Sequence, residues 1–432
     1  MERGASAARI RFAEFAFGIY NGCRVSDLRG LRESYSERSN GSGDEGCARL
    51  KGAIRGFGWK RLRLPYWKGN ARWSFSCLLV SSTAFSSWPN PLGAVSELRA
   101  NSQMNLTDNF GRSIHDLRIS ITDRCNYKCV YCRTGTNGAA YAELPFAEYL
   151  RIARILVGLG ITKIRLTGGE PLLRKGVVEF VRDLAKLRTS EGKKPEIALT
   201  TNGHLLAGIA QPLKDAGLDR VTVSMDAVDP ERFARITRVP NGYESVLAGV
   251  RAARQAGLDP VKINCVLLRG FNEDQIIPFG MFAREERVVV RFIEFMPLEE
   301  DRVWTPEIVV TLEEIVSRMS EYLPLEEIAH ERSETARRYR FSDGVGEIGI
   351  IAPVSHPFCG HCSRIRITSD GKLRTCLFSV WDHDLHELMR RGATDDRLVE
   401  FIVEVVERKE ERHHIGEPGF VPASRTMVHI GG

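Results

Sequence analysis

Residues 116–132 read DLRISITDRCNYKCVYC, and this stretch decides the fold. Its first part, Leu117–Ile121, is a short run of apolar residues around one arginine, which is typical of a strand buried in a parallel sheet. Its second part places Cys125, Cys129 and Cys132 on the loop that follows this strand. Cysteines so close in sequence are poorly placed to pair with each other and well placed to surround one metal centre.

Short β-rich runs then alternate with amphipathic segments as far as about residue 300. The expected further strands are Lys163–Leu166, Glu196–Thr200, Arg220–Ser224, Val261–Leu267 and Val288–Phe295. The expected helices lie near Pro145–Gly158, Val177–Leu187, Leu205–Ala216, Tyr243–Ala256 and Asp274–Arg284. Six strand–helix units in series predict a parallel α/β sheet with right-handed crossovers, either open and doubly wound or a whole or partial barrel. In both architectures ligands bind at the carboxyl ends of the strands.

The charge of the chain is unevenly distributed. The 432 residues carry 61 Lys and Arg against 55 Asp and Glu, a net charge of +6. Residues 1–100 hold 16 of the basic residues against 8 of the acidic ones, so the remainder is slightly acidic. This distribution argues against a nucleic-acid partner for the remainder. The longest apolar run is far too short to span a membrane.

The expected organisation has three parts. Residues 1–103 sustain neither helical nor strand periodicity, and are expected to be a poorly structured extension. They could be an organelle presequence, an accessory domain, or the product of a start assigned ahead of Met104. Residues 104–300 would form the sheet, and residues 301–432 a C-terminal region with short strands in Tyr339–Cys376 and a helix near Arg397–Glu411. Activity lost on deleting residues 1–103 would contradict the early-start interpretation.

A second cysteine group lies in the C-terminal region, at Cys359, Cys362 and Cys376. Three thiolates can hold a cubane iron–sulfur cluster through three irons and leave the fourth iron open, whereas closed ferredoxin-type clusters use four. A structural zinc ion also prefers four ligands. Zinc completed by His356, His361 or His383 therefore remains an alternative at the second group, and zinc completed from afar remains one at the first.

Three motifs carry a resemblance to a known family. The first cysteine group, with Tyr131 just before its last cysteine, resembles the radical S-adenosylmethionine superfamily. Thr167–Pro171 reads TGGEP and is similar to the motif with which those enzymes contact the methionine amino group. Residues 359–366 read CGHCSRIR and resemble the CxxCxRxR signature of the GTP 3',8-cyclase family, which performs the first step of molybdenum cofactor biosynthesis. The likeness runs from about Phe110 to the terminal Gly431–Gly432.

The resemblance implies an enzyme of the lyase class that cyclises GTP to 3',8-cyclo-7,8-dihydro-GTP with a radical made from S-adenosylmethionine. It implies a partial (βα)6 TIM-type barrel with a C-terminal extension that carries a second iron–sulfur cluster. The cofactors would be two [4Fe-4S] clusters and S-adenosylmethionine. The cluster ligands would be Cys125, Cys129, Cys132, Cys359, Cys362 and Cys376; the S-adenosylmethionine contacts would be Tyr131, Gly169, Ser224 and Met296; the GTP contacts would be Arg118, Arg165, Thr200, Lys262, Arg364, Ile365 and Arg366; and Arg291 would act beside the substrate as a catalytic residue.

The residues themselves add to this expectation. Arg118 and Arg165 lie inside apolar strands, so side chains that point into a barrel there need an anionic partner. Cys265 lies within a strand and is expected to be a buried apolar residue. In the family the terminal glycines enter the active site. Two departures from the family pattern, Ser363 and the Arg-Thr-Gly that follows Cys132, remove no ligand.

The resemblance also implies partners. These are GTP, a low-potential electron donor and a cyclic pyranopterin monophosphate synthase that receives the product, and a homodimer is compatible with it. No nucleic acid or membrane is expected. Oxygen-sensitive clusters imply the cytoplasm, or the mitochondrial matrix if residues 1–103 are a presequence. Two rivals remain open: a two-cluster radical enzyme that modifies a peptide, and a non-catalytic protein with zinc at both cysteine groups.

Overall fold

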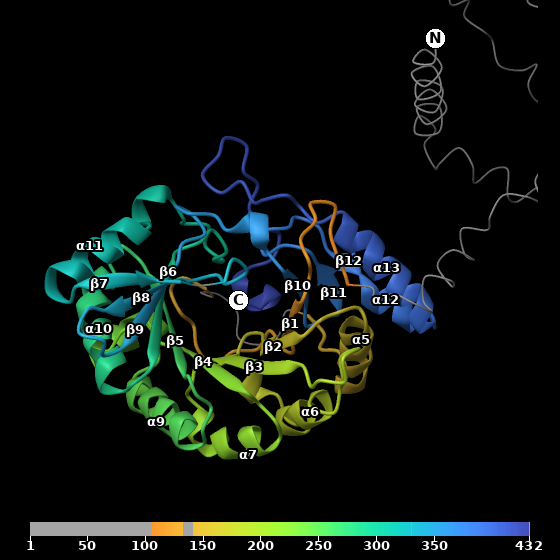
Figure 1. Ribbon diagram of the computed structural model, residues 1–432, viewed down its shortest axis with the longest axis horizontal. Coiled ribbons are helices and arrows are strands. Elements are labelled where there is room, and N and C mark those ends of the chain that lie inside the picture. Colours follow the sequence, from red (N-terminus) through yellow and green to blue (C-terminus); the bar gives the residue numbers. More distant parts are fainter. Residues whose placement is uncertain (1–104, 133–140, 330, 432) are drawn as a thin grey trace, which may run out of the picture. The chain divides into compact units, whose positions relative to one another are not determined.

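A computed structural model describes residues 105–132, 141–329 and 331–431 (Figure 1). The expectations for residues 1–103, for Gly432 and for the Arg-Thr-Gly after Cys132 lie outside the described residues. The six expected strands are confirmed as parallel neighbours with bounds shifted by two residues at most. They are β1 (Asp116–Ser120), β2 (Lys163–Thr167), β3 (Glu196–Thr201), β4 (Arg220–Ser224), β5 (Lys262–Leu267) and β6 (Val289–Glu294).

The segment after residue 300 supplies both edges of the same sheet. The strand order is β12-β11-β10-β1-β2-β3-β4-β5-β6-β9-β8-β7, with β9 parallel to β6 and β10 parallel to β1. The sheet curves without closing, which confirms a partial barrel (Figure 1). The added strands are β7 (Leu325–Ile328), β8 (Arg337–Phe341), β9 (Glu347–Ile351), β10 (Arg364–Ile367), β11 (Lys372–Arg374) and β12 (His383–Asp384).

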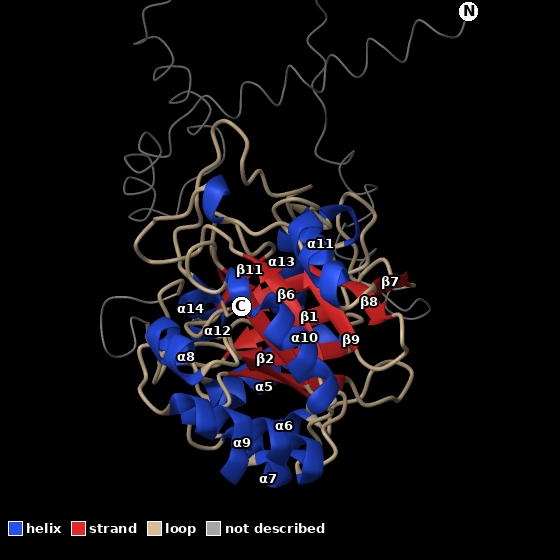
Figure 2. Cartoon of the chain, turned by 90° about the vertical axis from the view of Figure 1, so that its left-hand side faces the viewer, coloured by secondary structure: helices blue, strands red, loops and turns tan. Residues whose placement is uncertain are grey.

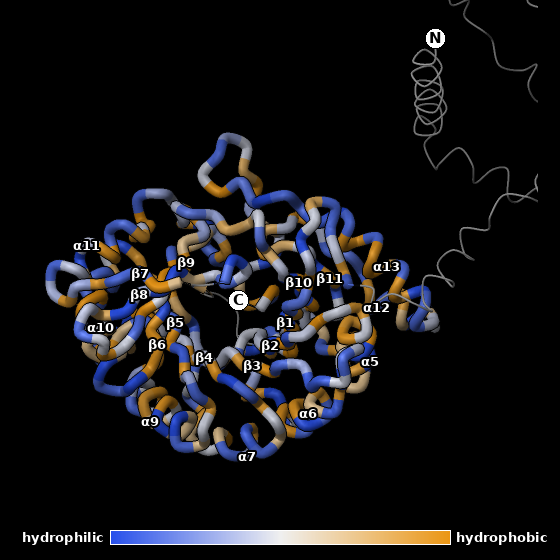
Figure 3. Tube along the Cα trace, viewed as in Figure 1, coloured by the Kyte–Doolittle hydropathy of each residue, from blue (hydrophilic) through white to orange (hydrophobic). Residues whose placement is uncertain are grey.

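Helices cover the outer face of the strands (Figure 2). Apolar and polar residues alternate along these helices (Figure 3), and all but the last turn their apolar stripe to the sheet. The last helix instead packs Ile430 into a separate apolar cluster with Leu298. The helices are α5 (Phe146–Gly158), α6 (Val177–Leu184), α7 (Ala210–Asp215), α8 (Pro230–Thr237), α9 (Gly242–Gln255), α10 (Ile276–Glu285), α11 (Leu312–Tyr322), α12 (Leu385–Arg390), α13 (Asp395–Glu407) and α14 (Met427–Ile430). None of these described helices has the length and apolar character needed to cross a membrane.

Four helices, α8, α11, α12 and α14, were not expected from the periodicity. Three of them, α8, α11 and α12, begin with a residue whose side chain caps the helix. The Asp229 carboxylate accepts a hydrogen bond from the Arg232 backbone N–H at 2.7 Å, and Pro230 follows at the first helical position. Thr311 caps α11 in the same way. The capping pattern is therefore the signal that could have found these three.

Candidate active site

A cavity of about 650 Å³ lies against the curved sheet, and residues of both cysteine groups line it. Every site residue expected from the sequence lines this cavity except Ile365. Ile365 is completely buried in the apolar core, because Arg364 and Arg366 on either side of it in β10 face the cavity. A contact between the Ile365 side chain and a ligand in the cavity is therefore wrong.

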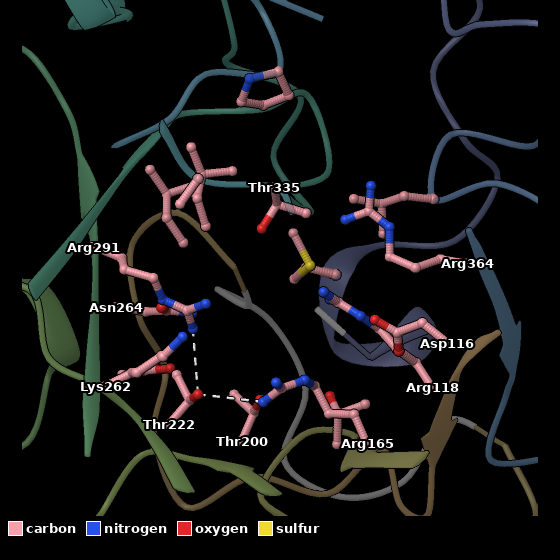
Figure 4. A pocket seen from close by; sticks show the side chains of 18 of the residues that line it. Asp116, Arg118, Arg165, Thr200, Thr222, Lys262, Asn264, Arg291, Thr335 and Arg364 are labelled. Carbon is pink, nitrogen blue, oxygen red and sulfur yellow. Dashed lines mark hydrogen bonds between the residues drawn. The ribbon is translucent and has the colours of Figure 1, made fainter. Parts of the chain in front are cut away.

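The register of the strands brings the expected polar residues into rows. Arg366, Arg118 and Arg165 are direct neighbours across β10, β1 and β2. Thr222 stands beside both Thr200 and Lys262 across β3, β4 and β5. Side chains at alternate positions of a strand share a face, so these residues all point into the cavity, as Figure 4 shows for those that it labels.

Hydrogen bonds tie part of this set together. Arg165 donates to the hydroxyls of Thr200 at 3.3 Å and Thr222 at 3.2 Å, and Arg291 donates to Thr222 at 3.2 Å (Figure 4). The sequence analysis missed Thr222, although it lies two residues before Ser224 in the same strand. It also missed Asn264, which pairs in register with Arg291.

The cations that line the cavity repel one another, and burial and neighbouring positive charges lower the pKa values of Lys262 and Arg291. Burial and the charge of Arg291 lower the pKa of Lys262 to about 8. Burial and the charge of Arg165 lower the pKa of Arg291 to about 9. The Nε atoms of Arg118 and Arg291 have no hydrogen-bond partner among the residues that the structure describes. A cluster of buried like charges with unused donors is arranged for a polyanionic ligand such as a triphosphate.

Asp116, which the sequence analysis did not assign, provides one nearby counter-charge. Burial raises the pKa of this carboxyl, but Arg118, Arg165, Lys163 and Arg364 outweigh that effect and lower it. Its Oδ1 atom is buried without a hydrogen-bond partner and its side chain lines the cavity. The carboxylate is therefore ionised and spaces the arginines around it.

The loop with the first cysteine group is held from two sides. The backbone N–H groups of Lys128 and Val130 donate to the carbonyls of Thr237 and Ile236 at the end of α8, at 3.2 and 3.0 Å. Tyr131 donates its hydroxyl to the Asp226 carboxylate at 2.7 Å. Burial raises the pKa of Asp226 to about 6. Asp226, which follows β4, therefore fixes the aromatic ring that stands beside Cys132.

The glycine pair of the TGGEP motif packs on this loop. A Cβ at Gly168, where φ is +146°, would lie 2.2 Å from the Thr122 carbonyl oxygen, and a Cβ at Gly169 would lie 2.3 Å from that of Arg124. The Gly169 N–H donates to the Thr122 carbonyl at 2.8 Å. The glycines are thus required for the contact between two backbones, whereas the sequence alone had suggested close approach to a ligand.

Glu170 of the same motif is wholly buried and does not line the cavity. Its carboxylate accepts hydrogen bonds from the Thr201 hydroxyl at 2.8 Å and from the backbone N–H groups of Asn202 at 2.6 Å and Leu172 at 2.9 Å. Burial raises its pKa to about 7. In this structure Glu170 therefore joins the motif to the end of β3.

The second cysteine group lies on two turns next to β10. Arg364 donates to the Cys362 sulfur at 3.6 Å. Burial by itself would raise the pKa of Cys362, but the positive charges of Arg364 and Lys409 outweigh it and lower the pKa to about 6. The thiolate, which is the form of cysteine that binds metals, is therefore favoured at this position.

Both groups fit an iron–sulfur cubane with one open iron. Each brings three cysteine side chains to the cavity, which has room for a ligand between them. Within the described ranges, no three His, Cys, Asp or Glu side chains are arranged to hold a single metal ion. Cys265 is fully buried in the core, as expected.

The chain's C-terminal end reaches the same cavity wall. Arg366 donates to the carbonyl oxygen of Gly431. Gly431 has a φ of +76°, and a Cβ there would lie 2.9 Å from Thr167 Cγ2 and 3.1 Å from Ser120 Cβ. A residue with a side chain would not fit between these strand ends.

An ion-pair network centred on Arg425 holds the C-terminal tail, residues 425–431, in place. Arg425 binds both carboxylate oxygens of Asp370, at 2.8 and 2.9 Å, and its Nε pairs with Asp382 at 2.5 Å. Its guanidinium carbon lies 4.1 Å from the centroid of the Tyr141 ring. The His429 ring packs edge-on against the same tyrosine. The tail is thereby tied to the segments on either side of the site.

Comparisons with known proteins agree with this geometry. Residues 119–282 match the Radical SAM superfamily, and residues 288–415 match Molybdenum Cofactor Synthesis C. A GTP 3',8-cyclase of Corynebacterium glutamicum is 43% identical over 338 residues, covering 76% of this chain and 89% of that protein. One of Heliobacterium modesticaldum is 42% identical over 332 residues, covering 76% of this chain and all of that protein.

Among solved structures, Streptococcus suis SuiB bound to its precursor peptide SuiA is similar in fold. The two share a TM-score of 0.51 and 14% sequence identity, over 88% of this chain and 87% of SuiB.

Proposed function

Because this chain belongs to the GTP 3',8-cyclase family within the radical SAM superfamily, we propose here which of its residues perform that family's reaction. The chain is an enzyme of molybdenum cofactor biosynthesis that cyclises GTP in a radical S-adenosylmethionine-dependent reaction. The superfamily implies a [4Fe-4S] cluster and S-adenosylmethionine. When bound, they supply the 5'-deoxyadenosyl radical that takes a hydrogen atom from GTP.

The first cluster would be held by Cys125, Cys129 and Cys132. S-adenosylmethionine would lie beside it, against the Tyr131 ring that Asp226 orients and against Gly169 at the turn after β2. Ser224, the last residue of β4, and Met296, two residues after β6, line the same cavity. Enclosure at the strand ends would keep water and other reactants away from the radical.

A second cluster would be held by Cys359, Cys362 and Cys376, and GTP would lie between the two clusters. Its triphosphate would lie among the cations of the cavity, because guanidinium groups can donate two parallel hydrogen bonds to phosphate oxygens. The residues that would bind it are Arg118, Arg165, Thr200, Lys262, Arg364 and Arg366. Arg291, fixed by Thr222, would stand beside the reacting part of the substrate.

The observation that carries this proposal is that both cysteine triads and the cation set line one cavity. Residues 104–300 would make the radical and supply Arg118, Arg165, Thr200 and Lys262 to GTP. Residues 301–432 would supply Arg364 and Arg366 and hold the second cluster. A low-potential electron donor and a synthase that receives the product would be its partners. Because its clusters would be sensitive to oxygen, the enzyme would work in a reducing compartment. This would be the cytoplasm, or the mitochondrial matrix if residues 1–103 are a presequence.

The test is anaerobic incubation of the reconstituted full chain with S-adenosylmethionine, a reductant and either GTP or ATP. We expect 5'-deoxyadenosine and a cyclised nucleotide that depend on GTP. Cys125→Ala should abolish both, and Cys265→Ala is the matched control, because Cys265 is buried in the core away from the cavity. Absence of GTP-dependent 5'-deoxyadenosine with full iron content would refute the proposal. Modification of a peptide in its place would favour the rival radical enzyme.

A further inference from the structure

The groups buried around the two cysteine triads carry opposite charges. We infer that this asymmetry holds the two clusters at different reduction potentials, with the second cluster the more easily reduced and Lys409 as a residue that sets its potential. The inference rests on the proposed function, because it requires a cluster at each triad. Its evidence is the position of the charges that surround each set of sulfur atoms.

Lys409 is a buried cation at the second triad, with 3% of its surface exposed. Its ammonium donates to the backbone carbonyl of Arg364 at 3.0 Å and to that of Thr375. These carbonyls lie two residues after Cys362 and one residue before Cys376. The ammonium therefore joins the two segments that carry the ligands, and in the described part of the chain it forms no ion pair with a carboxylate.

Arg364 adds a second positive charge at the same triad. Its guanidinium donates to the Cys362 sulfur at 3.6 Å and forms no ion pair with a described carboxylate. Arg112 donates to the Cys359 carbonyl at 2.9 Å, but its charge is balanced by Asp108 at 2.5 Å. A buried cation that touches a ligand sulfur acts directly on the electron that the cluster receives.

The acidic groups near the second triad do not cancel these cations. Glu410 accepts a hydrogen bond from the Thr375 hydroxyl at 2.6 Å, and Asp116 pairs in register with Arg364. Against these two carboxylates stand four cations that are buried or half-buried in the same wall. They are Lys409, Arg364, Arg366 and Arg118.

The first triad has the opposite environment. Glu170 is completely buried and Asp226 is 2% exposed, and neither forms an ion pair with a described cation. Of the basic residues on the cysteine loop, Arg124 is exposed and pairs with Glu143 at 3.1 Å. The Lys128 side chain does not line the cavity. Buried charge at this triad is therefore negative.

Charge of this kind determines how easily a cluster takes up an electron. Reduction adds one negative charge, which a nearby cation stabilises and a nearby carboxylate destabilises, and the effect is larger in a site with little water. Net charge and hydrogen bonds to the sulfur atoms are known determinants of cluster potential. The difference in buried charge between the triads makes the second cluster easier to reduce than the first.

The first test is an anaerobic redox titration of the full chain at pH 8, monitored by electron paramagnetic resonance. S-adenosylmethionine is left out, because its positive charges would offset the acidic groups at the first triad. The full chain with Cys125, Cys129 and Cys132 replaced by alanine identifies the signal of the second cluster, and replacement of Cys359, Cys362 and Cys376 identifies that of the first. We expect the second cluster to have the more positive potential. Equal potentials, or the reverse order, would overturn the inference.

The second test changes one charge. Lys409→Gln keeps a donor for the backbone carbonyls and should shift the potential of the second cluster to more negative values, while Lys409→Arg should leave it near that of the parent. The matched control is Lys372→Gln, which removes a half-buried lysine of the same region that pairs with Asp384 and does not line the cavity. An unchanged potential in Lys409→Gln, with iron content intact, would overturn the role of Lys409.

The iron content separates this inference from the proposed function. Two clusters require roughly eight irons per chain, and about four would refute the second cluster itself. If both clusters are present and GTP is converted, a failure of the expected order overturns only the inference drawn from the charges.

Discussion

Replacing Arg425 with alanine should release the C-terminal tail from the active site. The Arg425 guanidinium is 6% exposed and binds Asp370 through two hydrogen bonds and Asp382 through a third. Asp382 would retain Arg374 as a partner, whereas Asp370 would lose its one ion-pair partner in the described part of the chain and keep the Thr368 hydroxyl at 2.6 Å. The truncated side chain would also leave the face of the Tyr141 ring uncovered.

Removing one partner of a buried ion pair costs about 3–5 kcal/mol. Because the Asp370 side chain is 15% exposed and water can reach it, we take about 3 kcal/mol from the lower end of that range. This loss of free energy should weaken the docking of the tail and leave the sheet intact, because Arg425 lies just before α14 and outside the strands of the sheet. At about 1.4 kcal/mol for each factor of ten, the ratio of docked to undocked tail should fall roughly 150-fold.

Hydrogen exchange measured by mass spectrometry reports docking independently of catalysis. The amide of Gly431 donates to the Met427 carbonyl at 3.0 Å and should exchange faster in Arg425→Ala, with a parallel loss of GTP cyclisation at unchanged iron content. Arg425→Lys should restore part of both. The control is Arg397→Ala, which removes a half-exposed pair with Glu400 and should change neither. Unchanged tail exchange and full activity in Arg425→Ala would refute this reasoning.

Four further changes test other parts of the site. Gly431→Ala should lower the cyclisation rate at least tenfold with iron content intact, because a Cβ 2.9 Å from Thr167 Cγ2 costs about 1–3 kcal/mol; an unaffected rate would show that the tail has room. Burial raises the pKa of Glu170 from 4.5 to about 7, so this carboxyl ionises at a lower pH in the unfolded chain than in the folded one. The free energy of unfolding of the cluster-free protein should therefore fall by about 3 kcal/mol as the pH rises from the unfolded to the folded pKa. Urea unfolding should show a smaller loss in Glu170→Gln, and an identical pH dependence would contradict the assignment. Arg165→Gln should raise the Kd for GTP about tenfold or more by removing charged hydrogen bonds, with S-adenosylmethionine affinity unchanged in calorimetry; equal weakening of both ligands would argue for general damage. Cys359→Ala should keep the iron of the first cluster and lose GTP turnover, and normal turnover would exclude a role for the second triad.

Much of the site could be predicted from local sequence. The spacing of Cys125, Cys129 and Cys132 is a short-range property, and so is the alternation that places Arg118 and Arg165 inside apolar strands. Polar residues at the carboxyl ends of parallel strands meet at one edge of a sheet, whatever loops connect them. These patterns predicted strands β1–β6. The resemblance to the GTP 3',8-cyclase family named the site residues, and all of them except Ile365 line the cavity.

Other residues depend on contacts that no local pattern contains. The pairing of β10 with β1 places Arg366 beside Arg118 although the two strands are far apart in sequence. Thr222 acts as a shared acceptor only because the registers of β3, β4 and β5 align it with two neighbours. Ile365 was named together with the two arginines that flank it, but strand geometry turns its side chain to the opposite face.

The two cysteine triads and the parallel strands could be read from the sequence, because spacing and periodicity are encoded over a few residues. The resemblance to a known family added the cations. Only the tertiary structure decided that the C-terminal segment supplies both edges of the sheet. It also decided that the glycine pair of the TGGEP motif joins two backbones, and that the charges buried around the triads have opposite signs. These outcomes depend on strand register and on which groups exclude water together, and both arise only when distant parts of the chain pack against each other.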